Sequence, residues 1–357
     1  MHLIFSLFKL WIVICWLPFC LCFGYPTDEN GASRRSLSPL CNGHAELCSR
    51  RYSNVTYVTA HNSPFNQLGN PASNQAASIE TQLDDGVRML QFQTHFQDNE
   101  LRLCHTSCKI LDAGLLVDLL RRLRVWLANH PNEVVSVLMG NDNFIDVGNY
   151  TAPIVNSGLI DYVYHPPAAN LDLDAWPTLG DMIQNNSRVV MMLDYKANFT
   201  HVPYILDEFL VMWETKFSPT DPSFPCTPER PPHQSDEVRR TKMMLMNHNL
   251  NQNFSIEGVE ILVPYWTKLD QTNADHGNGS VGDAARHCET AWSRSPNFLL
   301  VDYYEDGNYP GSVFTVATEA NSLTYAHSGS SDQLTAKITD VIFVYLGIVL
   351  IFMLPWS

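Results

Sequence analysis

Short apolar runs alternate with stretches of helical periodicity along most of this 357-residue chain. The clearest helical stretch, residues 114–130, places leucines on one face and arginines on the other, and it ends before Pro131. The apolar runs are hydrophobic on both faces, which is typical of strands buried in a parallel sheet. We predict strands at 55–63, 87–95, 133–141, 188–196, 242–250, 259–266 and 298–304.

This alternation continues for about 300 residues, a length that suits one closed (β/α) barrel. A doubly wound open sheet is the alternative, but no G-x-x-x-x-G-K-[ST] motif is present to indicate a nucleotide site. We therefore predict an α/β fold of the (β/α) barrel type. Weaker helical patterns between the strands cover residues 75–85, 175–184, 281–294 and 312–325.

Most of the predicted strands end in polar or ionisable residues. In barrel enzymes the active site is built at the carboxyl ends of the strands. One such residue is usually a turn or cap group, but a polar end on six strands costs free energy unless these residues line a wet cavity. The residues at the predicted strand ends are His61, Asn62, Gln91, Gln93, His95, Asn141, Asp142, Asp194, Lys196, Asn247, His248 and Asp302.

The N-terminus has the composition of an export signal. Residues 3–23 are apolar except for Ser6 and Lys9, which predicts a secretory signal peptide over residues 1–24. An uncleaved membrane anchor is the alternative, because the positive region is weak. Residues 25–50 are rich in Pro, Gly, Ser and Asn and predict a mobile lead-in, which leaves residues 51–326 for the barrel.

Residues 327–357 match the signal for a glycosylphosphatidylinositol (GPI) anchor. A polar spacer, 327–340, precedes an apolar tail, 341–357. A tail helix is the alternative, although about 17 apolar residues without a basic stop are marginal for a membrane span. We therefore predict a secreted protein that is GPI-anchored at the cell surface. The expected attachment site is Ser328, Gly329 or Ser330.

Charge and sequons agree with an exported protein. The formal net charge of −15 and the lack of a basic stripe argue against nucleic acid as a partner. Six N-x-S/T sequons predict a glycosylated exterior. Their asparagines are Asn54, Asn149, Asn185, Asn198, Asn253 and Asn278.

Six of the nine cysteines follow the predicted signal peptide. An even number in an oxidising compartment favours disulfides over thiolate metal sites. The stretch 104–108 (CHTSC) could instead bind a metal, but no partner C-x-x-C or H-x-x-x-H lies nearby. The sequence leaves the pairing open, and proximity suggests Cys41–Cys48, Cys104–Cys108 and Cys226–Cys288.

Several of these segments together resemble the phosphatidylinositol-specific phospholipase C (PI-PLC) X-domain proteins. The resemblance is strongest to their secreted, disulfide-bearing branch, the PLC-like phosphodiesterases often found in fungi. It covers roughly residues 52–325 and implies a distorted TIM barrel with phosphoric diester hydrolase activity. The segments are TAHNSPF (59–65), GVRMLQFQTH (86–95), RLCHTSCKILDAG (102–114), NEVVSVLMGN (132–141) and NFLLVDYYEDG (297–307).

The resemblance implies roles for two histidines and one carboxylate. His61 is similar to the general base of the family and His105 to its general acid, and an ordinary imidazole pKa of about 6.5 suits both tasks. Asp302 resembles the carboxylate that orients the base. With an inositol lipid, the 2-hydroxyl of the substrate would attack phosphorus and release diacylglycerol and a cyclic phosphate.

The strand-two positions depart from the family pattern. Calcium-dependent members carry carboxylates where this chain has Gln91 and Gln93, and calcium prefers anionic oxygens, so we predict no metal and no cofactor. Metal-independent members carry an arginine at the position of Gln93. The residue that stabilises the phosphate charge is therefore unassigned. The candidates are Lys196, Arg88, His95 and His248.

Two functions from different classes remain. The first is a phosphodiesterase that cleaves an inositol phospholipid or a glycosyl-inositol-phospholipid at the membrane surface. The second is a cell-surface binding or scaffolding protein that kept the barrel and lost turnover, because glutamines replace the charged residues. A glycerophosphodiester hydrolase is a weaker alternative, since its A-H-R-G start is absent. The predicted substrate contacts are Asn62, Gln91, Gln93, Asn141, Asp194, Lys196 and His248.

Overall fold

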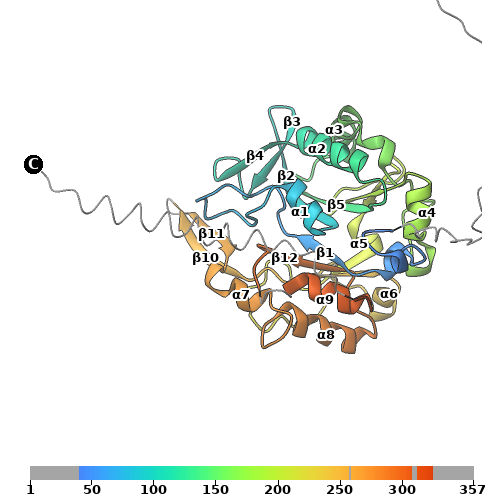
Figure 1. Ribbon diagram of the computed structural model, residues 1–357. Coiled ribbons are helices and arrows are strands. Elements are labelled where there is room, and N and C mark those ends of the chain that lie inside the picture. Colours follow the sequence, from blue (N-terminus) through green and yellow to red (C-terminus); the bar gives the residue numbers. More distant parts are fainter. Residues whose placement is uncertain (1–39, 257–258, 308–311, 325–357) are drawn as a thin grey trace, which may run out of the picture. The chain divides into compact units, whose positions relative to one another are not determined.

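The computed structural model describes residues 40–256, 259–307 and 312–324. Parallel strands follow one another in chain order around a curled sheet (Figure 1). The last strand, β12 (Phe298–Val301), pairs with the first, β1 (Tyr57–Ala60). In the described part of the chain, β7 (Ile205–Asp207) and β8 (Met212–Glu214) form no ladder, so the barrel is open there and the predicted distorted barrel is confirmed. The other strands are β2 (Met89–Gln97), β5 (Val135–Asn141), β6 (Val189–Leu193) and β9 (Met243–Asn247).

Helices lie outside the strands, with α1 (Ile79–Asp85) and α2 (Leu116–Asn129) on one side and α8 (Val281–Trp292) and α9 (Ser312–Ala320) on the other (Figure 1). In α2, leucines at three- and four-residue spacing are buried while the arginines are exposed. All four lie within predicted helical stretches. The shorter helices are α3 (Thr151–Ser157), α4 (Leu179–Gln184), α5 (Glu208–Val211), α6 (Asp236–Arg240) and α7 (Leu269–Thr272); 3₁₀ turns span Ala45–Leu47, Tyr52–Asn54, Val147–Tyr150, Leu159–Tyr162, Leu173–Ala175 and Trp266–Lys268.

Side chains alternate between two hydrophobic clusters along each strand. One cluster joins outward-facing strand residues, such as Val58 and Leu299, to the helices around the barrel. The other contains inward-facing residues, such as Tyr57 and Phe298, whose rings stack at 5.4 Å between centroids. Both faces of the parallel sheet are therefore buried, which explains why its strands are apolar throughout.

The inward-facing positions change from apolar to polar at the carboxyl ends of the strands. β12 presents Leu300 inward, and the next position of the same parity is Asp302. In the same way β9 presents Leu245 and then Asn247. A polar layer therefore caps the apolar interior of the barrel. Its other members include His61, Gln93 and Asp194.

Two antiparallel extensions project beyond the barrel strands. The far end of β2 pairs with β3 (Glu100–His105), which pairs with β4 (Leu111–Leu115). β10 (Asn251–Ile256) and β11 (Val259–Pro264) form a separate two-stranded sheet (Figure 1). The apolar run at 259–266 is thus a strand, but the prediction that it belongs to the main sheet is wrong. The three-residue strands β7 and β8 were too short to give an apolar run of their own.

The packed part of the chain begins earlier than its composition predicts. Residues 25–50 were expected to be a mobile lead-in, but Cys41 and Leu47 are buried in the inward-facing cluster. The Asn42 side chain bonds both to the N–H of Val134, at 2.7 Å, and to its carbonyl oxygen, at 3.2 Å. The disulfide Cys41–Cys48 closes this segment, which belongs to the fold because it covers an apolar surface.

The three disulfides join Cys41 to Cys48, Cys104 to Cys108 and Cys226 to Cys288, as proximity suggested. The stretch 277–282 has the form G-x-G-x-x-G, but it follows α7 rather than a strand, so it lacks the context of a dinucleotide site. Gly282 serves packing, since a Cβ there would lie 1.7 Å from the carbonyl oxygen of Asp275.

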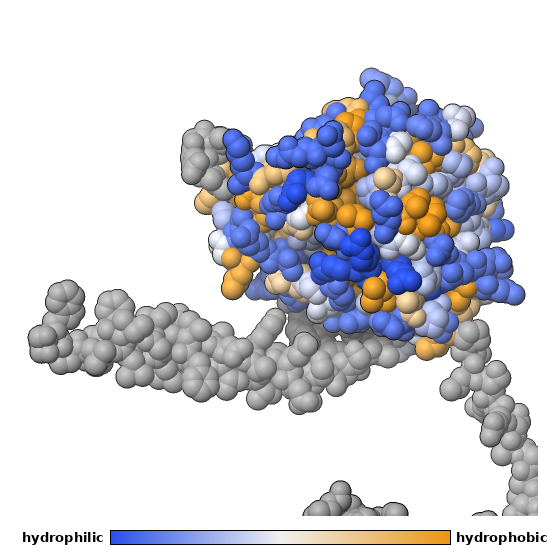
Figure 2. All heavy atoms as spheres, turned by 90° about the horizontal axis from the view of Figure 1, so that it is seen from above, coloured by the Kyte–Doolittle hydropathy of each residue, from blue (hydrophilic) through white to orange (hydrophobic). Residues whose placement is uncertain are grey.

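The surface carries the six predicted glycosylation sites. All six sequon asparagines are exposed, and glycosylation itself stays a prediction. Figure 2 shows hydrophilic residues over most of one face, with hydrophobic side chains in separate groups between them. Within the described residues, no helix is both long and apolar enough to cross a membrane. The predicted signal peptide and the predicted anchor signal lie outside the described residues.

Candidate active site

A cavity of about 780 Å³ opens at the carboxyl ends of the barrel strands. Polar residues from several strand ends converge on it, as the sequence predicted. A narrow recess beneath it reaches into the barrel, and His61, Gln93 and Asp194 line both spaces. The predicted residues that line the cavity are His61, Asn62, Gln93, His95, His105, Asn141, Asp142 and Asp194.

His61 directly follows β1, and a buried carboxylate holds its ring. The Nδ1 atom lies 2.7 Å from Oδ1 of Asp302, which also accepts a 2.8 Å hydrogen bond from the Asn74 amide. Both His61 and Asp302 are buried. Because a carboxylate oxygen accepts from Nδ1 and the Asn62 amide donates to Nε2, the contacts place the ring proton on Nδ1 and the lone pair on Nε2.

Asparagine amides surround the same imidazole. Asn62 donates to Nε2 at 3.1 Å, and its backbone is left-handed (φ 49°), a conformation that asparagine tolerates better than most residues. The amide nitrogens of Asn74 and Asn249 each lie 3.3 Å from Nδ1. Sequence reasoning missed both of these residues. Asn249 adjoins the polar pair that ends β9 and could have been found, whereas Asn74 lies in a loop without a distinguishing pattern.

His105 ends β3 inside the small turn that the disulfide Cys104–Cys108 closes. Its ring lines the same cavity as His61 and meets Phe65 edge-on at 5.5 Å. The prediction of a disulfide rather than a metal site at 104–108 is confirmed. Burial, followed by the nearby charges of His61 and His95, lowers the pKa of His105 to about 4. With this pKa the ring is neutral at pH 7.

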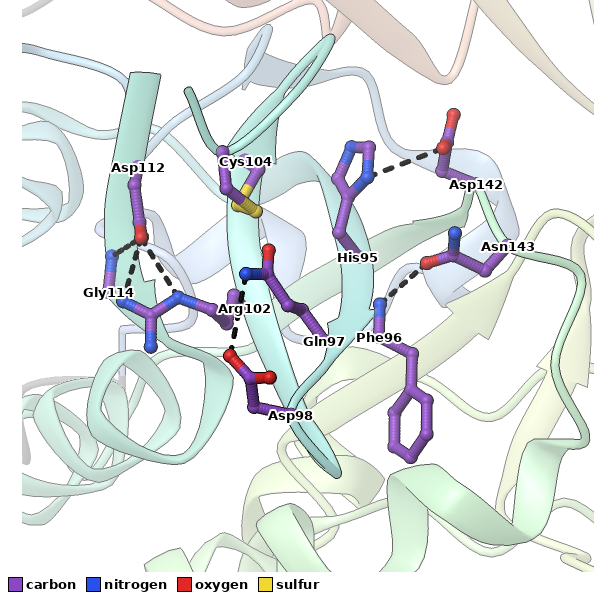
Figure 3. Close-up of a disulfide and its surroundings, with 11 residues drawn as sticks. His95, Phe96, Gln97, Asp98, Arg102, Cys104, Asp112, Gly114, Asp142 and Asn143 are labelled. Carbon is purple, nitrogen blue, oxygen red and sulfur yellow. Dashed lines mark hydrogen bonds and ion pairs between the residues drawn. A yellow bond between two sulfur atoms is a disulfide. The ribbon is translucent and has the colours of Figure 1, made fainter. Parts of the chain in front are cut away.

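His95 forms a second histidine–aspartate pair at the cavity. It lies on the part of β2 beyond the barrel, and its side chain points toward Asp142 with 3.3 Å between Nδ1 and Oδ2 (Figure 3). Its Nε2 atom is buried without a hydrogen-bond partner among the described residues. His95 thus remains a candidate contact for substrate, as the sequence suggested.

Three predicted residues lie away from the cavity. His248 is fully buried: its ring stacks on Phe224 at 3.7 Å and burial lowers its pKa to about 3. Lys196 is exposed, and it does not line the cavity. Arg88 forms an ion pair with Glu133 at 2.7 Å. The prediction that His248 and Lys196 bind substrate is therefore wrong. The prediction that any of the three stabilises the phosphate charge is wrong as well.

Two predicted substrate contacts, Asn141 and Gln91, hydrogen-bond to backbone groups of the protein instead. The Asn141 amide donates to the carbonyl oxygens of Ile145 and Tyr195, at 2.9 and 3.0 Å, so it shapes the cavity wall. Gln91 lies in the recess, where its Oε1 atom accepts the Asn62 N–H at 2.9 Å. Its role is to hold the turn that carries Asn62.

The described residues contain one cluster with the composition of a metal site. Three ligand atoms come together only at Cys104, Cys108 and Asp112. The two sulfur atoms of this set form the disulfide and offer no thiolate. The absence of a metal cofactor stays a prediction.

The family model for the PI-PLC X domain, described as PI-PLC X 1, matches residues 47–316 of this chain. This chain belongs to the PI-PLC X family. It is 40% identical over 273 residues to the PI-PLC X domain-containing protein 1 of Arthroderma benhamiae, covering 75% of this chain and 86% of that one. It is 53% identical over 285 residues to an uncharacterized secreted protein of the same fungus, covering 80% of this chain. This chain spans 64% of that relative's length.

A solved structure supports the fold. A variant of phosphatidylinositol-specific phospholipase C from Staphylococcus aureus superposes with a TM-score of 0.52 at 14% sequence identity. The match covers 80% of this chain and 98% of the bacterial enzyme. At this identity the likeness establishes the barrel and says nothing of individual residues.

In this PI-PLC X protein the recess carries charges that sequence reasoning missed. Arg230 pairs with the buried Glu214 at 2.6 Å. Burial, and then the charge of Glu214, raise the pKa of the neighbouring Glu208 well above its ordinary value. Burial also raises the pKa of Asp194 to about 6. Arg230 follows a proline-rich loop rather than a strand, which is why no pattern indicated it.

In this PI-PLC X protein the side chain of Gln93, on β2, packs directly against Gly140 of β5. A Cβ atom at Gly140 would lie 2.0 Å from Oε1 of Gln93. Glycine on β5 therefore gives the Gln93 amide its place in the recess. A neutral side chain is built into the position where the family resemblance led us to expect a charge.

Proposed function

We propose that this protein is a phosphoric diester hydrolase of the phospholipase C type, acting on an inositol phospholipid or a glycosyl-inositol-phospholipid. The observation that carries the proposal is the placement of two imidazoles, His61 and His105, on one cavity. Asp302 is hydrogen-bonded to the first of them. This arrangement suits an in-line displacement in which one ring removes a proton and the other supplies one.

The chemistry assigns one proton to each histidine. The 2-hydroxyl of the inositol attacks phosphorus, and Nε2 of His61 takes the hydroxyl proton. Asp302 then stabilises the imidazolium. The bond from phosphorus to the glycerol oxygen breaks, and His105 donates its proton to the leaving alkoxide. The products are a cyclic inositol phosphate and diacylglycerol, and exchange with water returns both rings to their starting state.

The acid role requires that substrate binding protonates His105. An anion within a few ångströms of an imidazole raises its pKa by about 1 to 3. We expect myo-inositol 1,2-cyclic phosphate, whose charge is constant across the titration, to raise the pKa of His105 from about 4 by such an amount. The measurement is an NMR titration of the ring with and without this compound. His201, an exposed histidine paired with Asp146, is the internal control. An unchanged pKa at saturating ligand would remove His105 from the mechanism.

The cavity mouth supports a lipid as the substrate. Phe144 and Phe217 are exposed and line the cavity, and exposed apolar side chains at an opening are typical of lipid contact. Leu68, in the loop after β1, and Phe254, on β10, are exposed as well. The secreted relative and the predicted signal and anchor sequences support a location at the outer membrane surface, where the acyl chains would stay in the bilayer.

The alternative is a binding or scaffolding protein without turnover. Two observations favour it: burial lowers the pKa of His105 to about 4, and the Asn62 amide donates to the Nε2 atom of His61. Catalysis requires the substrate to displace this amide. A protein that binds the head group without displacing it would retain affinity and show no turnover.

The deciding experiment uses purified residues 25–327 and phosphatidylinositol vesicles, with either EDTA or calcium. We expect release of cyclic inositol phosphate in both conditions, because glutamines stand at the strand-two positions where calcium would need carboxylates. The control carries both His61→Ala and His105→Ala. Product at the level of this control, with phosphatidylinositol and with a glycosyl-inositol-phospholipid alike, would contradict the enzymatic function and favour the binding function.

A further inference from the structure

Arg230 is the positively charged side chain that reaches the reaction site. Among the described residues that line the cavity and the recess, it is the only lysine or arginine. His61 lines both spaces as well, so the guanidinium and the imidazole border the same cavity and the same recess. Arg230 is largely buried, with 17% of its side chain exposed.

The backbone fixes Arg230 at the end of β8. Its carbonyl oxygen accepts the N–H of Glu214 at 2.8 Å, and the N–H of Glu229 donates to the Glu214 carbonyl oxygen at 2.9 Å. Residues opposite one another in such an antiparallel bridge have side chains on the same face. The disulfide Cys226–Cys288 ties the same loop to α8. The loop that carries Arg230 is thus held by backbone hydrogen bonds to β8 and by a disulfide to α8.

Side-chain contacts fix the guanidinium plane. Its Nε and Nη2 atoms both lie against Oε2 of Glu214, at 2.7 and 2.6 Å. Its Nη1 atom donates to the hydroxyl of Tyr195 at 3.3 Å. The ring of Phe217 stacks against the guanidinium with 4.0 Å to the ring centroid. An arginine oriented in this way loses little conformational freedom when it binds a ligand.

Two N–H groups of Arg230 stay available. A guanidinium has five, and Glu214 takes two and Tyr195 takes one. The remaining two, one on each terminal nitrogen, have no further hydrogen-bond partner in the described part of the chain. Burial, and then the charge of Glu214, raise the pKa of the neighbouring Glu208 well above its ordinary value, which disfavours a second negative charge beside Glu214. A fork of two N–H groups fits two oxygens of a phosphate.

We infer that Arg230 binds the phosphate group of the phosphodiester and stabilises the charge that develops on its non-bridging oxygens. This inference rests on the proposed function and adds the cation that the His61 and His105 pair lacks. Charge grows on those oxygens in the transition state, and a preorganised donor in a partly desolvated site stabilises it more than water does. The side chain comes from the loop after β8 and lines the same recess as Gln93.

The test compares substitutions that keep or remove the fork. Arg230→Lys keeps the charge and loses the fork, and we expect kcat/KM for phosphatidylinositol to fall by about 10²- to 10³-fold. The second variant carries Arg230→Gln together with Glu214→Gln, so that no buried charge is left unpaired. It should lose at least as much activity, and thermal unfolding confirms that it folds.

Arg88→Lys is the matched control. Arg88 also binds one glutamate, Glu133, through Nε and Nη2, at 2.9 and 2.7 Å, and it also lies over an aromatic ring, that of Trp126. It does not line the cavity. This substitution should lower the melting temperature and change kcat/KM less than threefold, which separates loss of an ion pair from loss of phosphate binding.

A binding measurement separates this inference from the proposed function. Calorimetry with myo-inositol 1,2-cyclic phosphate should show at least tenfold weaker binding to Arg230→Lys than to the unaltered protein. That result supports the inference even if no lipid is cleaved, in which case only the enzymatic function fails. Equal binding by both proteins, no binding by the unaltered protein, or activity of Arg230→Lys within threefold would each overturn it.

Discussion

Replacing His105 by alanine is expected to slow cleavage of phosphatidylinositol by about 10²- to 10⁴-fold. The same variant should cleave a p-nitrophenyl phosphodiester of inositol within about tenfold of the unaltered protein, because a leaving group of low pKa departs without a proton. His105 supplies the proton to the glycerol oxygen in the proposed mechanism. Removing His105 should therefore lower the rate most for the substrate whose leaving group has the higher pKa.

His61→Ala provides the contrast that identifies the two roles. The base acts on the attacking hydroxyl, which is the same in both substrates. The cleavage rate of this variant should therefore fall by about 10²- to 10⁴-fold on each substrate. Initial rates on the two substrates measure the difference. His201→Ala, which removes an exposed histidine, controls for the loss of an imidazole. Equal losses for His105→Ala on both substrates would contradict its assignment as the acid, and an active His61→Ala variant would contradict the base.

Much of the fold and of the site could be predicted from buried apolar strands that end in polar residues, and strand geometry explains why. In a strand the side chains at every second position share a face, so a buried strand that ends in a polar residue of inward parity predicts a cavity contact. His61 follows this rule from β1 and Asp194 follows it from β6. Asp302, of inward parity after β12, is buried behind His61 and contacts its ring instead. The barrel itself follows from strands that are apolar on both faces.

The same parity explains two errors. Asn247 faces the recess, so His248, one position later, faces the opposite way and packs on Phe224. Lys196 has inward parity, but β6 ends at Leu193 and the chain is left-handed at Lys196 (φ 66°), so the strand period no longer applies. A strand-end rule holds only as far as the strand extends.

The remaining site residues come from contacts that no local pattern encodes. Asn74 reaches Asp302 across 228 positions of sequence, and Arg230 reaches the recess through a loop anchored by Cys226–Cys288. Such residues are placed by tertiary packing. The strand-two glutamines indicated that a charge was missing, but only the packed structure brings Arg230 into the recess that they line.

Asp302→Asn is expected to lower kcat by about 10²- to 10³-fold, because the neutral amide no longer stabilises the imidazolium of His61. We expect no change in the tautomer of His61 beyond this loss of activity. Both His61 and Asn74 bind the same oxygen, Oδ1, at 2.7 and 2.8 Å. The Asn74 amide will therefore keep the oxygen of the new side chain at that place, and Nδ1 of His61 will keep its proton. Nitrogen NMR of His61 should show the same tautomer in the variant as in the unaltered protein.

Adding Asn74→Ala to this variant tests the argument. Without the Asn74 donor, the amide at position 302 is free to turn its nitrogen toward Nδ1, which would move the ring proton to Nε2 and remove the base. We expect a further loss of activity together with a change of tautomer, whereas Asn74→Ala alone should keep the tautomer because the carboxylate enforces it. Asp146→Asn, at the exposed pair with His201, is the control and should leave kcat unchanged. If Asp302→Asn retains a third of the activity, the carboxylate does not support the base, and His61 acts without it.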